Sequence, residues 1–171
     1  MTKSKTKDKE KKDVLRFPTP TFRVSYPVLT PKQLEAQKVN LAQNAKAKDT
    51  SNTKYSIDML FDADEDLSVF KKNLLKAAKK GFPDWSDKKI KKSVKARFKD
   101  GDLKDTPEYA GQIYLTASTT RPPGVLDLDG SSMMDIENDF YAGCYARGFV
   151  TAATYDGYGG GVTLYLGSLA L

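Results

Sequence analysis

The stretch YAGCYARGFVTAATYDGYGGGVTLYL, residues 141–166, decides the fold class of this chain. Small and large side chains alternate along its first half, which is typical of a β-strand and predicts one from Tyr141 to Tyr155. The glycine-rich run at 157–161 predicts a chain reversal, and residues 162–166 predict a returning strand. The stretch is therefore expected to form a long β-hairpin with a glycine-rich tip.

The two faces of the strand predicted at 141–155 carry side chains of different size. One face has small residues, which suit the crowded interior of a narrow barrel. If the other face points outward, its rings can stack on bases and its guanidinium can pair with phosphate. The alternative is that the large rings form the core, and one β-bulge would exchange the faces. The small face comprises Ala142, Cys144, Ala146, Gly148, Val150 and Ala152, and the large face Tyr141, Tyr145, Arg147, Phe149 and Tyr155.

Three further segments are predicted to be extended. Residues 17–29 alternate but contain three prolines, which predicts an edge strand. Lys54–Phe61 is the clearest strand, with Ser56 and Asp58 on its polar face. Residues 113–118 also alternate. About five strands with helices inserted between the second and third predict a mainly β fold of the α+β class, a five-stranded OB-type Greek-key barrel, although a sandwich has the same periodicity.

Three helices are expected between these strands. Thr30-Pro31-Lys32-Gln33 has a capping residue, a proline at the first helical position and a glutamine three residues after the cap. Residues 67–80 place apolar side chains three and four positions apart, which predicts one buried stripe. Residues 86–99 repeat this pattern, although their end could be extended. The exposed faces of the last two helices would carry Lys72, Lys76, Lys79, Lys80, Lys88, Lys92, Lys95 and Lys99.

The length of 171 residues allows one hydrophobic core of ordinary size. Residues 1–16 are rich in lysine and contain little to bury, so we expect a flexible basic N-terminal arm. Residues 17–171 are expected to form a single OB-fold domain for nucleic-acid binding, with a helical insertion at about 64–99.

Charge is distributed unevenly along the chain. Residues 71–104 hold 13 basic and four acidic residues, whereas residues 105–171 hold two basic and eight acidic ones. This asymmetry indicates a polyanionic partner, although lysine runs are also common on solvated helix faces. Trp85 lies between the two basic segments as a core anchor or as a base-stacking platform.

Several functional classes are excluded or disfavoured. The chain has no histidine and one cysteine, so it cannot form a histidine-based triad, a Cys/His zinc site or an internal disulfide. Cys144 is expected to be a small buried residue, and no cofactor is expected. No secretion signal or membrane span is visible, so we expect a soluble intracellular protein. A magnesium-dependent nuclease remains an alternative, built on Asp127, Asp129, Asp135, Glu137 and Asp139.

The β-rich half contains a series of short motifs in a characteristic order. Over residues 54–166 their order and spacing resemble the family of tailed-bacteriophage single-stranded DNA-binding proteins. The motifs are Lys54-Tyr55-Ser56, Asp100-Gly101-Asp102, Tyr109-Ala110-Gly111 before Ala117-Ser118, Arg121-Pro122-Pro123, Phe140-Tyr141-Ala142-Gly143-Cys144-Tyr145, and Tyr155-Asp156 before the glycine run.

The resemblance implies a non-enzymatic OB-fold protein that coats single-stranded DNA, largely without sequence preference, during phage replication and recombination. It implies the cytoplasm of the infected bacterial host as the location. Phage or host replication proteins would be partners through an acidic C-terminal tail that is not present in this chain. Double-stranded DNA, RNA and a second copy of the chain are further candidate partners, and no membrane is expected. The candidate DNA-binding residues are Lys54, Lys72, Lys76, Lys79, Lys88, Lys92, Lys95, Tyr114, Arg121, Tyr141, Tyr145, Arg147 and Phe149.

Overall fold

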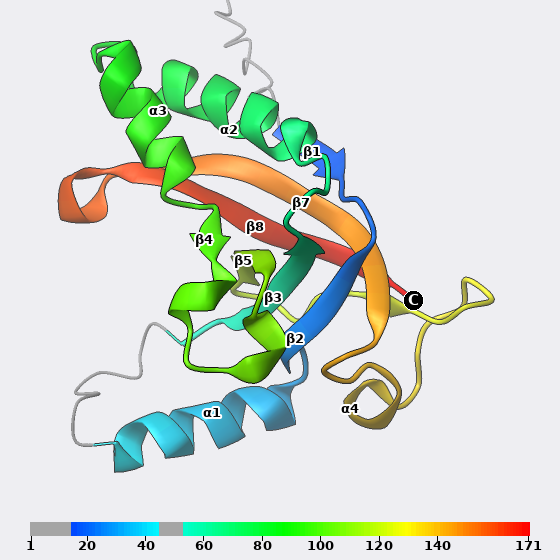
Figure 1. Cartoon of the computed structure of the whole chain (residues 1–171). Helices are drawn as coiled ribbons and strands as arrows, with labels where there is room; N and C mark the ends of the chain where they lie inside the picture. Colours follow the sequence, from blue (N-terminus) through cyan, green and yellow to red (C-terminus); the bar gives the residue numbers. More distant parts are fainter. Residues whose placement is uncertain (1–14, 45–52) are drawn as a thin grey trace, which may run out of the picture.

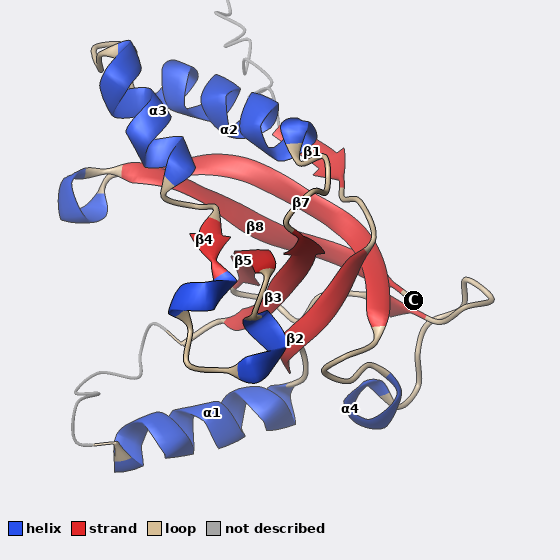
Figure 2. Ribbon diagram, in the orientation of Figure 1, coloured by secondary structure: helices blue, strands red, loops and turns tan. Residues whose placement is uncertain are grey.

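The computed structural model describes residues 15–44 and 53–171, and all statements below concern these residues. Strands occupy the centre of the molecule and helices its periphery (Figure 2). The strands are β1 (Leu15–Pro18), β2 (Phe22–Val28), β3 (Tyr55–Asp62), β4 (Lys99–Asp100), β5 (Gln112–Thr119), β6 (Val125–Leu126), β7 (Tyr145–Tyr155) and β8 (Gly161–Ala170). The helices are α1 (Pro31–Gln43), α2 (Ser68–Gly81), α3 (Asp87–Lys95) and α4 (Ile136–Asp139).

Five of these strands close into a barrel. The ladder runs β7-β2-β3-β5-β8, and a further pairing between β7 and β8 joins its two ends. The pairs are antiparallel except β5 with β8, which pair in parallel at Ser118 and Tyr165. The remaining strands extend this barrel at β7, β5 and β8. This arrangement confirms the predicted α+β fold with a five-stranded OB-type barrel.

The barrel interior is filled by the apolar faces that the strand periodicity predicts. Phe22 of β2, Ile57 and Met59 of β3, Leu115 of β5 and Leu164 of β8 are each at most 1% exposed. They belong to one apolar cluster that also includes residues of β1, α2 and α3. Closing the sheet on itself therefore buries a single inner face of all five strands.

The expectation of an edge strand at 17–29 is wrong for β2. This strand lies inside the barrel sheet, paired with β7 on one side and β3 on the other. Its proline, Pro27, is tolerated because the pairing with β3 shifts register between Ser25 and Val28, where no ladder donor is needed. The edge position belongs instead to the short β1, which pairs with β7 alone and ends at Pro18.

The long strand predicted from Tyr141 begins later, at Tyr145. Residues 141–144 form a turn because Gly143 adopts a positive φ of 103°, which an L side chain rarely adopts. The amide of Gly143 donates to the carbonyl of Val24, so the turn is held against β2. Ala142 and Cys144, predicted on the buried face, lie in this turn, where Ala142 is exposed and Cys144 is half-buried.

Within β7 the predicted assignment of faces is confirmed. Tyr145 and Phe149 are 67% and 41% exposed, whereas Ala146 and Val150 are each 1% exposed. The register shift between β7 and β8 places the extra residue on β8, so the alternation along β7 stays intact. Gly148 faces inward, where a Cβ atom would come 2.6 Å from the carbonyl oxygen of Ser168. The hairpin turns through residues 157–160, as the glycine run predicts.

Helices α2 and α3 pack side by side over the β7–β8 hairpin, and α1 lies on the opposite side of the barrel (Figure 1). Helix α1 starts with the predicted capping box, in which Thr30 and Gln33 satisfy each other's backbone amides. The predicted apolar stripes of α2 and α3 are buried, and Ser86 caps α3. Both helices fall inside the segment 64–99 that was expected to carry the helical insertion.

The predicted basic arm lies mostly outside the described residues. Residues 1–14 are not described, but Leu15 and Arg16 already belong to β1. Residues 45–52, between α1 and β3, are likewise not described. No helix in the described part of the chain is long and apolar enough to cross a membrane.

Candidate nucleic-acid interface

The outward side chains of β7 form the centre of an aromatic and basic surface. Neighbouring strands add side chains of the same kind because residues paired across a sheet share a face. Arg23 of β2 pairs with Tyr145, and Arg16 of β1 and Tyr165 of β8 both pair with Thr151. We call this surface the outer face and define it as Arg16, Arg23, Tyr145, Arg147, Phe149 and Tyr165.

The arginines of the outer face lie close to its rings and turns. The guanidinium carbon of Arg16 lies 4.6 Å from the ring centroid of Phe149. Arg23 passes over Gly143, where a Cβ atom would come 3.7 Å from its Nη2. Tyr141, in the adjoining turn, is 57% exposed. The outer face thus combines guanidinium groups with ring surface that solvent can reach.

No acidic residue occurs on the four strands that build the outer face. Strands β1, β2, β7 and β8 together contain arginine but no aspartate or glutamate. A surface with charges of one sign attracts a polyanion and raises its association rate. The composition of these strands therefore favours a phosphate-bearing ligand.

Sequence reasoning missed three members of the outer face. Arg16 was assigned to the flexible arm, Arg23 to an edge strand and Tyr165 to the returning strand of the hairpin, with no binding role for any of them. Strand alternation places each of them outward, because their neighbours in the sequence are buried. These neighbours are Phe17 beside Arg16, Phe22 and Val24 beside Arg23, and Leu164 and Leu166 beside Tyr165. The alternation is visible in the sequence, but only the strand pairing shows that these three side chains share one face.

A second group of aromatic and basic side chains surrounds Lys104, which follows the short helical turn Gly101–Leu103. The Nζ atom of Lys104 lies 4.8 Å from the ring centroid of Tyr26, 4.1 Å from that of Tyr109 and 5.0 Å from that of Tyr114. Lys99 lies over the ring of Tyr114 at 5.4 Å. We call these five residues the tyrosine–lysine cluster. The cluster brings together Tyr114, a predicted site residue, with four residues that were not predicted to belong to the site.

Asp58 of β3 holds this cluster in place. Its carboxylate accepts hydrogen bonds from the hydroxyls of Tyr109 and Thr116, both at 2.6 Å, and from Nζ of Lys104 at 3.2 Å. Asp58 was predicted on the polar face of its strand, opposite the apolar one, and the structure shows that it is only 9% exposed. The segment carrying Lys104 and Tyr109 folds back over β3, so this carboxylate is buried but has three partners.

Burial changes the proton affinity of two groups in the cluster. The pKa of Tyr109 is raised, mainly because its phenol is buried and also because its hydroxyl donates to Asp58. The pKa of Lys99 is lowered, mainly by burial, although the nearby carboxylate of Asp58 opposes this effect. The positive charges of Arg97 and Lys104 lower the pKa of Lys99 further, because these three cationic side chains lie near one another.

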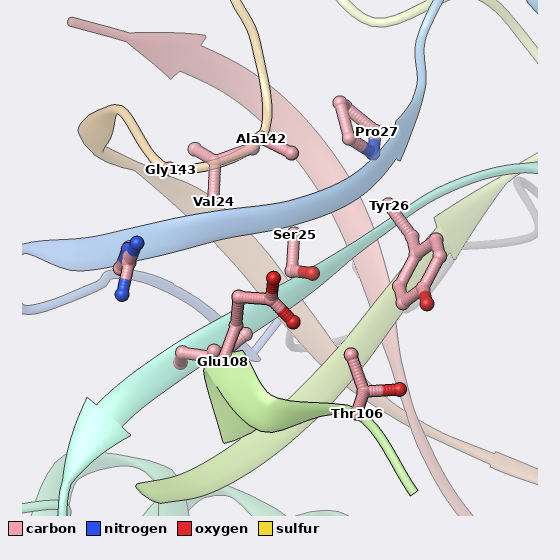
Figure 3. Close-up of a pocket in the computed structure, with 10 residues that line it drawn as sticks. Val24, Ser25, Tyr26, Pro27, Thr106, Glu108, Ala142 and Gly143 are labelled. Atoms are coloured by element: carbon pink, nitrogen blue, oxygen red, sulfur yellow. The ribbon is translucent and has the colours of Figure 1, made fainter. Parts of the chain in front are cut away.

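A pocket of about 520 Å³ lies on β2 between the outer face and the tyrosine–lysine cluster. Its lining includes Arg23 of the outer face and Tyr26 of the cluster. Figure 3 shows that Thr106 and Glu108 approach β2 from the opposite wall, while Gly143 lies across the strand. The two groups of aromatic and basic residues are thus joined by one continuous depression.

Tyr26, which lines this pocket, has a strained backbone conformation. It has a positive φ of 44°, although it is not a glycine, and its side chain is 56% exposed. Such a conformation costs free energy and occurs preferentially at functional positions. The register shift of β2 at Pro27 therefore presents the Tyr26 ring to solvent beside Lys104.

The predicted lysines of α2 lie away from the outer face. The ring of Phe70 on α2 contacts that of Phe17 at 5.4 Å between centroids, and Phe17 pairs with Val150 on the inner side of the sheet. Phe149 points to the other side of the same sheet. The sheet of β1 and β7 therefore lies between the outer face and helix α2. The exposed lysines of α2 are Lys72, Lys76 and Lys79.

The remaining predicted residues are distributed over two places. Lys54 and Arg121 are exposed and flank the same end of the β3–β5 ladder, where Tyr55 pairs with Thr119. Lys88, Lys92 and Lys95 are exposed on α3. The structure thus brings together Tyr141, Tyr145, Arg147 and Phe149, but it does not bring the helix lysines to them.

The acidic residues at 127–139 serve local structure. Asp129 accepts from the hydroxyl and amide of Ser131, and these hydrogen bonds lower its pKa. Asp135 caps α4. Glu137 accepts from the hydroxyl of Thr30 at 2.8 Å and so connects α4 to α1. In the described ranges no three acidic, cysteine or histidine side chains are grouped so as to hold a metal ion.

The geometry defines the class of this protein as an OB-like barrel whose outer face is aromatic and basic. The chain belongs to the family described as the single-stranded DNA-binding protein of Enterobacter phage Enc34, which it matches over residues 27–170. It is also 36% identical over 90 residues to protein p50 of Acyrthosiphon pisum secondary endosymbiont phage 1. That match covers 48% of this chain, and the chain spans about half, 49%, of the length of that curated relative.

Solved structures share the fold. The single-stranded DNA-binding protein from bacteriophage Enc34 in complex with ssDNA is 20% identical, with a TM-score of 0.66 over 91% of this chain and 85% of that chain. The single-stranded DNA-binding protein gp2.5 of bacteriophage T7 is 13% identical, with a TM-score of 0.56 over 91% and 90% of the two chains. These likenesses support the assignment of an OB-like fold.

Proposed function

We propose that this protein binds single-stranded DNA on the outer face and across the pocket on β2. The observation that carries the proposal is the pairing of exposed rings with arginines on strands that contain no acidic residue. Family membership supports the same ligand, because the family is named for single-stranded DNA binding. Residues 17–171 would act as one binding unit, and residues 1–16 would add positive charge to it.

Each group of side chains has a defined role in this proposal. Tyr145, Phe149 and Tyr26 present exposed rings on which bases stack, and every base has a π-face, so binding tolerates any sequence. Arg23 and Arg147 pair with phosphates, and counterion release adds to the binding free energy. The lysines of α2 and α3, together with Lys54 and Arg121, would strengthen the attraction of the strand.

The biological role follows from this activity. The protein would coat exposed single strands during phage DNA replication and recombination, in the cytoplasm of the bacterial host, without catalysing a reaction. Double-stranded DNA or RNA would bind through the lysine faces with less contribution from stacking. A second copy of the chain and replication proteins are proposed as protein partners.

A titration of labelled oligo-dT, followed by fluorescence anisotropy at two salt concentrations, tests the proposal. We expect saturable binding that weakens as salt rises, and weaker binding to a duplex of the same length. RNA of the same sequence provides a third ligand that separates strandedness from sugar chemistry. Equal or tighter binding to duplex DNA would favour the lysine faces as the main site, and the absence of binding to oligo-dT would overturn the proposal.

A further inference from the structure

A pocket outside the interface described above lies between α3 and the tip of the β7–β8 hairpin. In Figure 2 the helical turn at this tip, residues 157–159, lies below α3. The pocket has a volume of about 490 Å³, within the range of ordinary ligand sites. Its lining side chains come from two elements that are far apart in sequence.

The lining of this pocket is basic and aromatic. Lys89, Lys92 and Arg97 contribute three cations, and Tyr155 and Tyr158 contribute rings. No carboxylate is among its lining residues, whereas the pocket on β2 includes Glu108. A site that is rich in cations and has no acidic side chain in its wall is complementary to a phosphate group.

Tyr158 is presented to solvent in an unusual way. It is the one residue in 157–161 that is not glycine, its φ is +53°, and its side chain is fully exposed. Glycine would adopt this backbone conformation without strain, and an exposed ring gains nothing from burial. A ring kept at such a position is available for stacking on a ligand.

Trp85 also lines the pocket, and its ring has two close neighbours. Its ring stacks on that of Phe82, with centroids 4.0 Å apart and planes 7° apart, and Nζ of Lys89 lies 4.0 Å from its centroid. Both neighbours occupy ring surface, so Trp85 is neither a fully buried core anchor nor a free stacking platform. Its position beside Lys89 makes it sensitive to an anion that enters the pocket.

The pocket is connected to the interface through Arg97. Arg97 lines the pocket and lies two residues before Lys99 of β4, which belongs to the tyrosine–lysine cluster. Cationic side chains are therefore present on the outer face, in the tyrosine–lysine cluster and on α3, although Glu108 lines the pocket on β2 between the first two. A strand that follows phosphate-binding groups along this path reaches the hairpin tip.

We propose that the pocket between α3 and the hairpin tip holds one nucleotide of the bound single strand. Its phosphate contacts Lys92 and Arg97, and its base stacks on Tyr158. The inference rests on the proposed function and extends it, because it places the end of the binding path at a site that is not part of the barrel face. Oligonucleotides long enough to reach the pocket should bind more tightly than those that cover the outer face alone.

Trp85 provides a direct test because it is the one tryptophan of the chain. Tryptophan emission and the anisotropy of labelled oligo-dT are recorded together in one titration, with oligonucleotides of increasing length. We expect Trp85 emission to change only with the longer oligonucleotides, while anisotropy reports binding of all of them. If anisotropy shows saturation with long oligo-dT and Trp85 emission is unchanged, the inference is overturned and the proposed function stands.

Variants assign the signal to the pocket. The double variant Lys92→Gln, Arg97→Gln should abolish the emission change, and Tyr158→Ala should weaken binding of long oligonucleotides by about 5-fold to about 150-fold, the value of one stacked base. Tyr158→Ala should leave the binding of the shortest oligonucleotides unchanged. The double variant Lys88→Gln, Lys91→Gln is the matched control, since it removes two charges from exposed positions of the same helix that do not line the pocket. Its affinity should fall alike for all oligonucleotide lengths, whereas the emission change at saturation should remain.

Two further outcomes would contradict the inference. An emission change of full size in the Lys92, Arg97 double variant would mean that Trp85 senses binding elsewhere. An equal loss of affinity for short and long oligonucleotides in Tyr158→Ala would mean that the ring acts at the outer face. If labelled oligo-dT gives no anisotropy change at any length, the proposed function fails and this inference fails with it.

Discussion

Arg23 of β2 lies directly opposite Tyr145 of β7, so a guanidinium and an exposed ring are neighbours on the outer face of the barrel. This pairing joins two strands that lie far apart in the sequence. Neither residue contributes to the buried core, since Tyr145 is 67% exposed and Arg23 passes over Gly143. The pair can therefore be altered without removing interior packing.

Truncation of Tyr145 separates binding from folding. We expect Tyr145→Ala to lower the affinity for oligo-dT by about 1–3 kcal/mol, the value of one stacked base. Its free energy of unfolding should change by about 0.5 kcal/mol or less, because the ring is exposed. Thermal melting and a DNA titration measure the two quantities. A large loss of stability with unchanged affinity would show that the ring is structural.

Phe70→Ala provides the opposite control for this experiment. Phe70 is completely buried between Phe17 and Phe61, so its truncation should cost about 3–5 kcal/mol of stability. Affinity of the folded fraction should stay close to that of the parent protein.

The salt dependence of binding should identify which cations contact phosphate. On a single strand, each phosphate contact contributes about −0.7 to the slope of log K against log salt. The double variant Arg23→Gln, Arg147→Gln should therefore flatten the slope by about 1.4. The matched pair Lys72→Gln, Lys76→Gln removes the same charge from α2 and should change the slope less. If the lysine pair has the larger effect, the strand crosses α2 instead of the outer face.

The hydrogen bonds of Asp58 should stabilise the fold. Asp58→Asn removes the charge that accepts from Lys104 and leaves one buried and two half-buried donors with a poorer acceptor, so we expect a loss of about 1–3 kcal/mol. Asp62→Asn, on the same strand, is the control because Asp62 is exposed and accepts from Gln112 only at the surface. Chemical denaturation measures both variants. Equal stability of the two variants would contradict the role assigned to Asp58.

Tyr109 should make the fold sensitive to alkaline pH. Burial and the hydrogen bond to Asp58 raise its pKa in the folded state, so the unfolded chain releases the phenolic proton first. The stabilisation is complete below the ordinary tyrosine pKa of about 10 and decreases as pH rises above it. Tyr109→Phe should weaken this dependence, although it lowers stability at neutral pH. Denaturation curves at neutral and alkaline pH measure the effect, and equal alkaline decline in both proteins would contradict it.

Divalent metal ions should not induce DNA cleavage. The carboxylates of Asp129, Asp135 and Glu137 are engaged in a turn, a helix cap and a contact with the first turn of α1. Among the described residues no three such side chains are grouped so as to hold a metal ion. Incubation of the protein and labelled DNA with Mg²⁺ or Mn²⁺ should leave the DNA intact on a denaturing gel. Metal-dependent products that disappear in Asp135→Ala would support the nuclease alternative.

Local patterns in the sequence determined the elements and their inward faces. The alternation along 145–155, the apolar stripes of α2 and α3, and the capping box at Thr30 all involve residues within a few positions of each other. Such patterns depend on strand and helix periodicity, so they can be read without knowing what each element packs against. The hairpin and the two unlike faces of its first strand were therefore predictable, but the sequence left open which face points outward, because one β-bulge would exchange them.

Only the tertiary structure decided which elements are neighbours. Periodicity shows which side of β2 is buried, but it does not show that β2 lies between β7 and β3, which places Arg23 beside Tyr145. It also does not show that Lys104 and Tyr109 cover Asp58. Strand pairing and chain closure depend on contacts between distant segments, and many pairings are compatible with the same local pattern. For that reason the arginines, the tyrosine–lysine cluster and the separation of the α2 lysines from the outer face emerged only from the folded chain.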